Sequence, residues 1–244
     1  MAVVTGGSRG IGWAIAQRLA AEGARVVVGS RTPPPGDAGG AITHLECDVS
    51  VPEQARRLVD AAAERHGGLD VLVNNAAVEH EATVEHTTPE DWDRVMAVNL
   101  RGPFLCTKYA IPHLRARGGG AIVNVASVDG LWAEPELAAY CTSKGGLLAL
   151  TRAVAIDHGA DGIRCTAICP SYVRTAMLDQ FYDAQPDPAA ARREAGALHP
   201  VRRISEPEEV AALCAWLASP EATFASGQPF VLDGGLTAGR VHRG

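Results

Sequence analysis

The chain has 244 residues, of which 47% are hydrophobic and 20% are charged, and its formal net charge is -6. These proportions are ordinary for a globular protein and exclude intrinsic disorder, which requires low hydrophobicity and high charge. The negative net charge argues against a nucleic-acid binder and against a protein that binds anionic membranes.

Local patterns indicate neither a membrane segment nor a metal or disulfide framework. No apolar run approaches the roughly 18 residues that span a bilayer, and residues 1–5 lack the features of a signal peptide. The six cysteines form no CxxC pair and show no His–Cys metal spacing. We therefore expect a cytoplasmic protein with reduced thiols, no bound metal and a small-molecule substrate.

Short apolar runs alternate with helix-length amphipathic segments. Several runs are continuous valine, isoleucine and leucine, which is typical of strands buried on both faces of a sheet. Strands that alternate with helices indicate one parallel sheet with right-handed crossovers. The sequence therefore predicts a single α/β domain over residues 1–244. Its expected strands are Ala2–Val4, Arg25–Gly29, Ile42–Cys47, Leu69–Val73, Ala121–Ala126, Ile163–Cys169 and Gln228–Leu232.

Helix signals lie between these strands. Ile11, Ile15 and Leu19 recur on one helix face, and Gly23 stands where the C-terminal cap of that helix belongs. Local motifs predict three further helix starts and one break or bend. The starts are at Ser50–Glu53, Thr88-Pro89 and Ser205–Glu208, and the break or bend is at Gly102-Pro103, just after Asn99.

Two segments interrupt the alternation. Thr32–Gly40 reads TPPPGDAGG, and its three consecutive prolines predict a tight, polyproline-like loop in place of a helix. Residues 175–204 are too long for a plain connection between a strand and the next helix. We expect them to form either a surface helical insertion or, as we prefer, a mobile lid over the substrate. The apolar lid residues are Met177, Leu178, Phe181 and Tyr182.

A glycine-rich turn follows the first predicted strand and opens a helix. Residues 5–12 read TGGSRGIG. Glycines let the backbone approach a phosphate closely, and a helix N-terminus offers free N–H groups to it. A purely structural turn is the alternative, but the strand–turn–helix context favours dinucleotide binding. The Gly-x3-Gly-x-Gly spacing differs from the common G-x-G-x-x-G fingerprint.

With these motifs the chain resembles the short-chain dehydrogenase/reductase family. The resemblance runs through nearly the whole chain in the family's order: TGGSRGIG at 5–12, CDV at 47–49, NNAA at 74–77, VNL at 98–100, NVAS at 124–127, YCTSK at 140–144, CPSYVRT at 169–175 and DGG at 233–235. It implies a Rossmann-like, doubly wound fold in which helices cover both faces of a seven-stranded parallel sheet. It also implies a homotetramer.

Tyr140 and Lys144 are spaced i, i+4, so both lie on one face of a helix. A lysine ammonium favours a nearby phenolate, which suits the pair to proton exchange with an alcohol or ketone oxygen. A surface Tyr/Lys pair is the common alternative, but Ser127, at a predicted strand end thirteen residues earlier, favours a site.

The family resemblance supplies the roles. Ser127 binds the substrate oxygen, Tyr140 exchanges the proton, and Lys144 lowers the pKa of Tyr140 and binds the nicotinamide ribose. Asn99 resembles the family's helix-kinking asparagine, which holds a water that links Lys144 to solvent; a helix breaker without chemical function is the alternative.

The second strand ends in Ser30 and Arg31, where an acidic residue would bind the 2′-hydroxyl of NAD. Arg31 and Arg9 are cations and no carboxylate accompanies them, so we expect NADP(H) in preference to NAD(H). The alternative is that Arg31 points to solvent. Asp48 is expected at the adenine edge, or as an N-cap before Pro52, or both. The full expected cofactor set is Gly6, Ser8, Arg9, Gly10, Ile11, Gly12, Ser30, Arg31, Asp48, Val49, Asn75, Ala76, Tyr140, Lys144, Pro170, Val173 and Thr175.

Residues near Ser127 and Tyr140 are candidates for the substrate pocket: His80, Asp129, Trp132, Glu134, Ser171, Tyr172, Met177 and Phe181. The leading hypothesis is an NADP(H)-dependent oxidoreductase of secondary alcohols and ketones. The alternatives are a 3-oxoacyl thioester reductase, an NAD-preferring sugar, polyol or hydroxysteroid dehydrogenase, and a non-enzymatic dinucleotide sensor. A thioester reductase is expected to have basic residues at its entrance, for which the candidates are Arg115, Arg117, Arg152, Arg192 and Arg193.

Overall fold

A seven-stranded parallel sheet forms the centre of the protein, as the sequence predicts. The computed structural model describes residues 1–36 and 39–239. The strand order is β3-β2-β1-β4-β5-β6-β7. The chain runs outward from β1 to β3, crosses back to β4 on the other side of β1, and then continues outward to β7. The strands are β1 (Ala2–Thr5), β2 (Val26–Ser30), β3 (Ile42–Glu46), β4 (Val71–Asn74), β5 (Gly120–Val125), β6 (Ile163–Pro170) and β7 (Pro229–Leu232).

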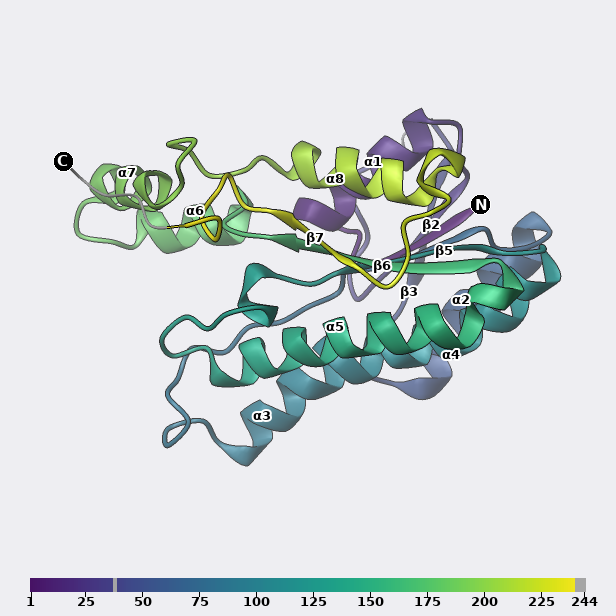
Figure 1. Ribbon diagram of the computed structural model, residues 1–244, viewed down its shortest axis with the longest axis horizontal. Helices are drawn as coiled ribbons and strands as arrows, with labels where there is room; N and C mark the ends of the chain where they lie inside the picture. The colour runs from purple at the N-terminus through teal and green to yellow at the C-terminus, as the bar shows by residue number, and fades with distance from the viewer. Residues whose placement is uncertain (37–38, 240–244) are drawn as a thin grey trace.

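Helices cover both faces of the sheet (Figure 1). The helices α1 (Gly10–Ala21) and α8 (Pro207–Ala218) pack together on one face. The other face is covered by α2 (Pro52–His66), α4 (Gly102–Ala116) and α5 (Ala138–His158). This arrangement is the doubly wound fold expected from the motifs.

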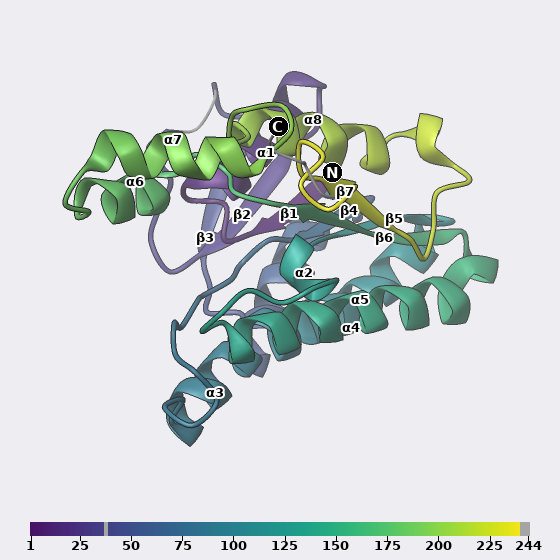
Figure 2. The ribbon, with the colours of Figure 1, turned by 60° about the vertical axis from the view of Figure 1, so that its left-hand side comes forward.

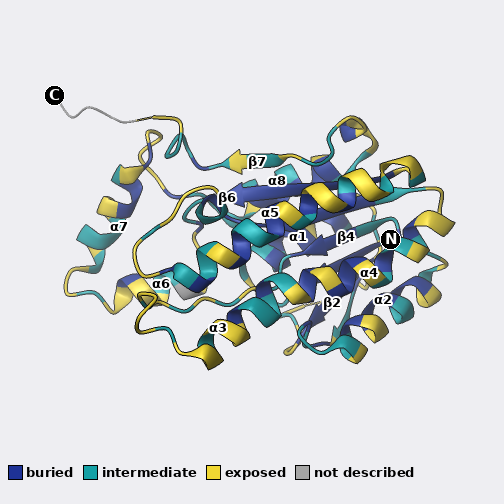
Figure 3. Cartoon of the chain, turned by 60° about the horizontal axis from the view of Figure 1, so that its bottom comes forward, coloured by how far each residue is buried: buried dark blue, intermediate teal, exposed yellow. Residues whose placement is uncertain are grey.

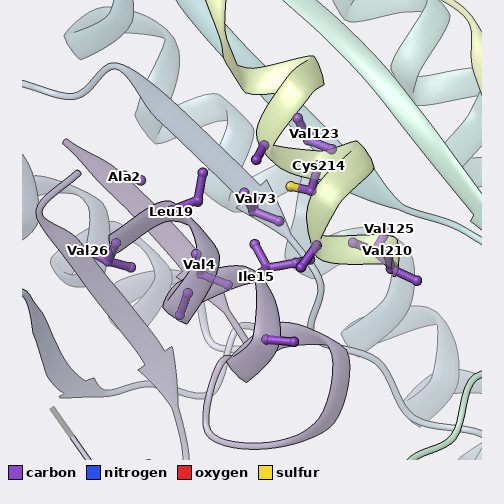
Figure 4. Packing of buried hydrophobic residues seen from close by; sticks show 14 of the residues in the cluster. Ala2, Val4, Ile15, Leu19, Val26, Val73, Val123, Val125, Val210 and Cys214 are labelled. Atoms are coloured by element: carbon purple, nitrogen blue, oxygen red, sulfur yellow. The ribbon is translucent and has the colours of Figure 1, made fainter. Parts of the chain in front are cut away.

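The core lies between the sheet and its two helical layers. Ile15 and Leu19 of α1 are buried, and Gly23 ends that helix with a φ of +89°. Figure 4 shows how these side chains and those of α8 pack against the valines of the central strands. The inner strands, such as β1 and β2, are buried in Figure 3, which explains their continuous apolar sequence, whereas the edge strands β3 and β7 are partly exposed.

Two of the three predicted helix starts are shifted. Thr88 caps α3 (Pro89–Met96) as predicted, because its hydroxyl accepts a hydrogen bond from the Asp91 N–H. Ser50 does not cap α2. Its hydroxyl and N–H both donate to the Asp48 carboxylate, so that Val51 occupies the N-cap position.

The second shift is at α8. The N-cap is Glu206, one residue later than the predicted Ser205. The Glu209 carboxylate reaches back to accept a hydrogen bond from the Glu206 N–H at 2.9 Å. The capping box is therefore present, but a glutamate takes the position predicted for serine.

The predicted break at Gly102-Pro103 is a π turn within a continuous helical segment. The helix α3 passes into the π turn η1 (Ala97–Arg101), which passes directly into α4. Pro103 is tolerated because it lies in the first turn of α4. A Cβ at Gly102 would lie 2.7 Å from a methyl group of Val49, which explains the glycine.

The two unusual segments take different forms. No helix connects β2 to β3 in residues 31–36 and 39–41, which agrees with the prediction from the prolines. Residues 175–204 contain α6 (Ala176–Asp183) and α7 (Pro188–Leu198), which extend from the carboxyl edge of the sheet (Figure 2). The described part of the chain contains no helix long and apolar enough to cross a membrane.

Candidate active site

A groove of about 610 Å³ follows the carboxyl ends of β1, β2 and β4. Twelve of the predicted cofactor residues line it: Gly6, Ser8, Arg9, Gly10, Ile11, Gly12, Ser30, Arg31, Asp48, Val49, Asn75 and Ala76. Thr175, at the start of α6, lines it as well. Pro170 and Val173 are buried and are not among its lining residues.

The glycine turn has the shape that a bound dinucleotide requires. Gly6 and Gly10 have φ values of +64° and +53°, in the left-handed region that favours glycine. A Cβ at Gly12 would collide with the carbonyl oxygen of Gly6 and with the amide of Asn75. The Asn75 amide donates to the carbonyl oxygens of Thr5 and Gly6 at 3.0 and 3.1 Å, which fixes the turn. The residues present therefore fit a dinucleotide phosphate at the start of α1.

The adenosine end of the groove combines two exposed cations with one carboxylate. Arg9 and Arg31 are exposed, whereas Ser30 is buried and donates from its hydroxyl to the main-chain oxygen of Thr32 at 2.7 Å. Burial alone would raise the pKa of Asp48, but hydrogen bonds from Ser50 and the charge of Arg31 lower it overall. Asp48 is thus ionised and available at the groove, and it is not the N-cap of α2.

The three predicted catalytic residues come together at the end of β5. Ser127 lies two residues beyond the end of that strand and caps the short helix η2 (Val128–Gly130), while Tyr140 and Lys144 lie in the first turns of α5. The Nζ atom of Lys144 lies 5.4 Å from the centroid of the Tyr140 ring. It donates a hydrogen bond to the main-chain oxygen of Val125 at 2.8 Å.

The ionisation of Tyr140 differs from the sequence-based expectation. Burial, with the charges of Glu79 and Asp129, raises the pKa of Tyr140 above its ordinary value, and a hydrogen bond with Ser127 opposes that rise. Lys144 is not among the groups that shift the pKa of Tyr140, and its ammonium donates to the Val125 carbonyl. Burial lowers the pKa of Lys144 itself to about 8.

Asn99 is fully integrated into the structure around the π turn. Its Oδ1 accepts from the Val78 N–H, and its Nδ2 donates to the Val78 carbonyl oxygen, both at 2.8 Å. The same Nδ2 lies 3.1 Å from the Ser143 hydroxyl, next to Lys144. Both polar atoms of the side chain are therefore in use, and any water near Lys144 would have to be held by main-chain atoms of the π turn.

Four of the predicted pocket residues, Glu134, Tyr172, Ser171 and Asp129, take part in three hydrogen-bonded pairs. The Tyr172 hydroxyl donates to the Glu134 carboxylate at 3.0 Å. Ser171 lies 2.8 Å from Nε2 of the buried His199, whose Nδ1 is 2.9 Å from the Ala195 oxygen. Because that oxygen only accepts, Nδ1 of His199 donates to it. Asp129 accepts a hydrogen bond from the hydroxyl of the catalytic candidate Ser127 at 2.8 Å.

The remaining pocket candidates lie less close to the catalytic residues. Nε2 of His80 lies 3.6 Å from a carboxylate oxygen of Asp91, and its charge contributes to the lowering of the Asp91 pKa. Trp132 and Phe181 are about half exposed, and Phe181 packs edge-on against Tyr182. The side chain of Met177 lies outside the described residues.

Sequence reasoning missed two residues of this region, Glu79 and His199. Glu79 follows the NNAA motif and its charge acts on Tyr140 and Lys144. His199 follows α7 within the lid segment, far from Ser171 in sequence. A charged residue five positions beyond the first asparagine of NNAA was the available signal for Glu79, whereas the partner of His199 depends on tertiary contact.

Comparison with known proteins gives consistent matches over the full length. A family model described as "Enoyl-(Acyl carrier protein) reductase" matches residues 6–237. The chain is 39% identical to meso-2,3-butanediol dehydrogenase of Serratia marcescens, over 97% of this chain and 94% of that protein. It is 40% identical to 2-(R)-hydroxypropyl-CoM dehydrogenase of Xanthobacter autotrophicus, with 98% of each covered.

A solved structure is also similar. Ligand-free aldohexose dehydrogenase of Thermoplasma acidophilum has a TM-score of 0.94 and 35% sequence identity to this chain, over 100% of this chain and 96% of that one. These relatives are named as dehydrogenases, and they agree with the site geometry in pointing to one family.

Proposed function

Because the chain belongs to the short-chain dehydrogenase/reductase family and is an oxidoreductase of CH–OH groups, we propose that it transfers a hydride between NADP(H) and a secondary alcohol or the corresponding ketone. The observation that carries this proposal is the meeting of Ser127, Tyr140 and Lys144 at the end of β5. They lie at the carboxyl edge of the sheet, the edge along which the dinucleotide groove runs.

Each residue has a role that its surroundings support. The nicotinamide supplies the hydride chemistry when bound. Tyr140 gives its phenolic proton to a ketone oxygen in reduction and takes it from the alcohol in oxidation. Ser127 hydrogen-bonds the same oxygen, and Lys144 provides a buried positive charge beside the ring. Asn99 positions the π turn beside Lys144.

The adenosine end supports NADP(H). Arg31 lies at the groove where a 2′-phosphate would be bound, and Arg9 adds a second cation on the same groove. No carboxylate replaces Ser30. A guanidinium favours phosphate because its charged N–H groups pair with phosphate oxygens.

The thioester-reductase alternative receives little support from the basic residues expected at its entrance. Arg115 pairs with Asp161 at 2.7 Å, and Arg117 pairs with Asp70 at 3.0 Å. Arg192 pairs with Asp183 at 2.7 Å. The charges of these three arginines are locally balanced, which weakens their attraction for an acidic carrier protein.

Three further features belong to the proposal. The helices α6 and α7 act as a lid over the substrate, the protein assembles as a homotetramer, and it is cytoplasmic. Thr175 at the start of α6 supports the lid because it also lines the dinucleotide groove. Exposed apolar residues, among them Ile156 and Phe224, support the tetramer. The six free thiols support a reducing compartment.

A panel of secondary alcohols and ketones, followed through the absorbance of the reduced nicotinamide, tests the proposed function. We expect turnover with both members of at least one alcohol–ketone pair, and faster turnover with NADP(H) than with NAD(H). A protein that binds the dinucleotide but converts no member of the panel would instead be the non-enzymatic sensor.

A further inference from the structure

The serine proposed to bind the substrate oxygen is itself held by a carboxylate. The Ser127 hydroxyl donates to Oδ2 of Asp129 at 2.8 Å, and the N–H of Asp129 donates back to the Ser127 oxygen at 3.1 Å. The two residues thus form a tight local loop at the start of η2. A substrate oxygen bound at Ser127 therefore brings its neighbouring carbon close to Asp129.

The second oxygen of Asp129 has no partner. Its Oδ1 is buried and accepts no hydrogen bond from the described residues. A buried acceptor without a donor is unfavourable, and in a folded protein such an atom calls for a specific explanation. This oxygen belongs to the same carboxylate that binds Ser127 through Oδ2, and its position points to a donor on the substrate.

The charges around Asp129 favour the same kind of group. Two further carboxylates lie within electrostatic reach of Asp129: Glu79, from the loop after β4, and Glu134, from the loop before α5. The charge of Asp129 acts on both of them, and the charge of Glu134 also acts on Glu79. Burial and this mutual repulsion raise the pKa of both glutamates. Lys144 is the cation that acts on Asp129 and Glu79, so the three carboxylates outnumber it.

We propose that Asp129 determines substrate specificity by accepting a hydrogen bond, through Oδ1, from a hydroxyl or ammonium group on the carbon next to the reacting one. The substrate class is then the vicinal diols and vicinal amino alcohols, with their hydroxy- and aminoketones. This inference rests on the proposed function, because it places the reacting oxygen at Ser127.

The same arrangement disfavours anionic substrates. A carboxylate or phosphate near the reacting carbon would face Asp129, Glu79 and Glu134 in a partly desolvated site, where like charges repel strongly. A simple alcohol meets no repulsion, but it leaves Oδ1 of Asp129 without a donor. The expected order of kcat/KM is therefore donor-bearing alcohol, then simple alcohol, then hydroxy acid.

A four-carbon series tests this order in the unmodified protein. The substrates are 2,3-butanediol, 3-amino-2-butanol, 2-butanol and 3-hydroxybutyrate, each at saturating NADP⁺ and at one ionic strength. We expect kcat/KM for the better of the first two to exceed that for 2-butanol by at least about tenfold, the effect of one charged hydrogen bond. 3-Hydroxybutyrate is expected below 2-butanol. The ratio between the diol and the amino alcohol identifies which donor the site prefers.

Asp129→Ala and Asp129→Asn localise the effect. Asp129→Ala removes the acceptor, so the diol-to-butanol ratio should fall to roughly one. Asp129→Asn keeps an acceptor for Ser127 but loses the charge, so discrimination by the ammonium should fall most. Glu81→Gln is the matched control: it removes one negative charge beside Glu79 without touching Ser127, and it should keep the parent's ratios.

The outcomes separate the two levels of the argument. Turnover of 2-butanol or 3-hydroxybutyrate equal to or better than that of the donor-bearing substrates overturns the inference and leaves the proposed function standing. An equal loss for every substrate in Asp129→Ala also overturns it, because Asp129 would then act only through Ser127. Absence of turnover across the series and its ketones overturns both.

Discussion

Lys144 and Tyr140 lie on the same face of α5, yet the lysine ammonium binds the main-chain oxygen of Val125 and not the phenol. Its Nζ lies 5.4 Å from the centre of the Tyr140 ring. Lys144 therefore places a positive charge beside the ring without bonding to the phenol. In the proposed mechanism Tyr140 exchanges the proton with the substrate oxygen.

Tyr140→Phe tests that assignment. The substitution removes the exchangeable proton and keeps the ring, so turnover should fall by at least about two orders of magnitude, the scale of positioned acid–base groups. Dinucleotide binding, measured by titration of fluorescence, should change little. A variant with near-parent turnover would show that another group exchanges the proton.

The buried lysine should also set a pH dependence of stability. Burial lowers the pKa of Lys144 from 10.5 to about 8. Between these values the unfolded chain keeps a proton that the folded chain has lost, so the free energy of unfolding rises with pH. Below about pH 8 both states are protonated and the contribution of Lys144 is constant.

Lys144→Met removes this titration. In urea unfolding between pH 8 and 10, the stability of the parent relative to this variant should increase with pH, by at most about 1.4 kcal/mol per unit. Lys108, exposed on α4, is the other lysine of the chain, and Lys108→Met is the control. A constant difference between parent and Lys144→Met across this range would contradict the prediction.

Asn99 should be important for stability. Asn99→Ala leaves the N–H and carbonyl oxygen of Val78 without their side-chain partners. Unsatisfied groups of this kind cost about 1–3 kcal/mol each, so the free energy of unfolding should fall by at least about 2 kcal/mol. Ser143→Ala, which removes only one contact of the Asn99 amide, should cost about 1 kcal/mol. Equal stabilities for the two variants would mean that the Val78 bonds contribute little.

The fold and the catalytic residues are readable from sequence because they depend on local patterns. The apolar runs match the strands closely, and the i, i+4 spacing places Tyr140 and Lys144 on one helix face. The glycine turn is recognisable for the same reason, since its left-handed φ values at Gly6 and Gly10 require that residue type.

The hydrogen-bond partners are not readable in the same way, because they depend on competition between neighbours. Ser50 has the spacing of an N-cap, but the Asp48 carboxylate two residues earlier takes its hydroxyl. Lys144 has the spacing of a partner for Tyr140, but a buried carbonyl lies closer to its ammonium. His199 has no local signal at all, because Ser171 lies across the site on another element.

The proposed tetramer predicts a mass in solution of about four times the 25.5 kDa of one chain. Ile156 on α5 is 83% exposed, and Phe224, after α8, is fully exposed. Subunit contacts in an assembly with two-fold axes would cover exposed apolar side chains of this kind. In light scattering, Ile156→Asp and Phe224→Asp should each lower the mass. A parent mass near that of one chain would refute the assembly.

The cofactor preference is tested most sharply at Arg31. Its contact with a 2′-phosphate exists for NADPH and is absent for NADH. A charge-assisted hydrogen bond contributes about 1.5–3 kcal/mol, which corresponds to roughly 10- to 150-fold in affinity. Arg31→Ala should weaken NADPH binding by that factor and barely change NADH binding. Arg57→Ala is the control, because Arg57 is exposed near the groove, binds the Glu46 oxygen and does not line the groove.

Two further variants separate charge from shape at the same position. Arg9→Ala should lose less NADPH affinity than Arg31→Ala, because Arg9 is exposed at the turn and also reaches solvent. Ser30→Asp should invert the preference, since a carboxylate repels the phosphate and accepts a hydrogen bond from the NADH ribose. It also replaces the hydroxyl that donates to the Thr32 oxygen, so residues 31–32 must adjust and Arg31→Ala is the cleaner measurement. Dissociation constants for both cofactors at one ionic strength decide the matter. If the parent binds NADH more tightly than NADPH, Arg31 faces solvent and the enzyme uses NAD(H).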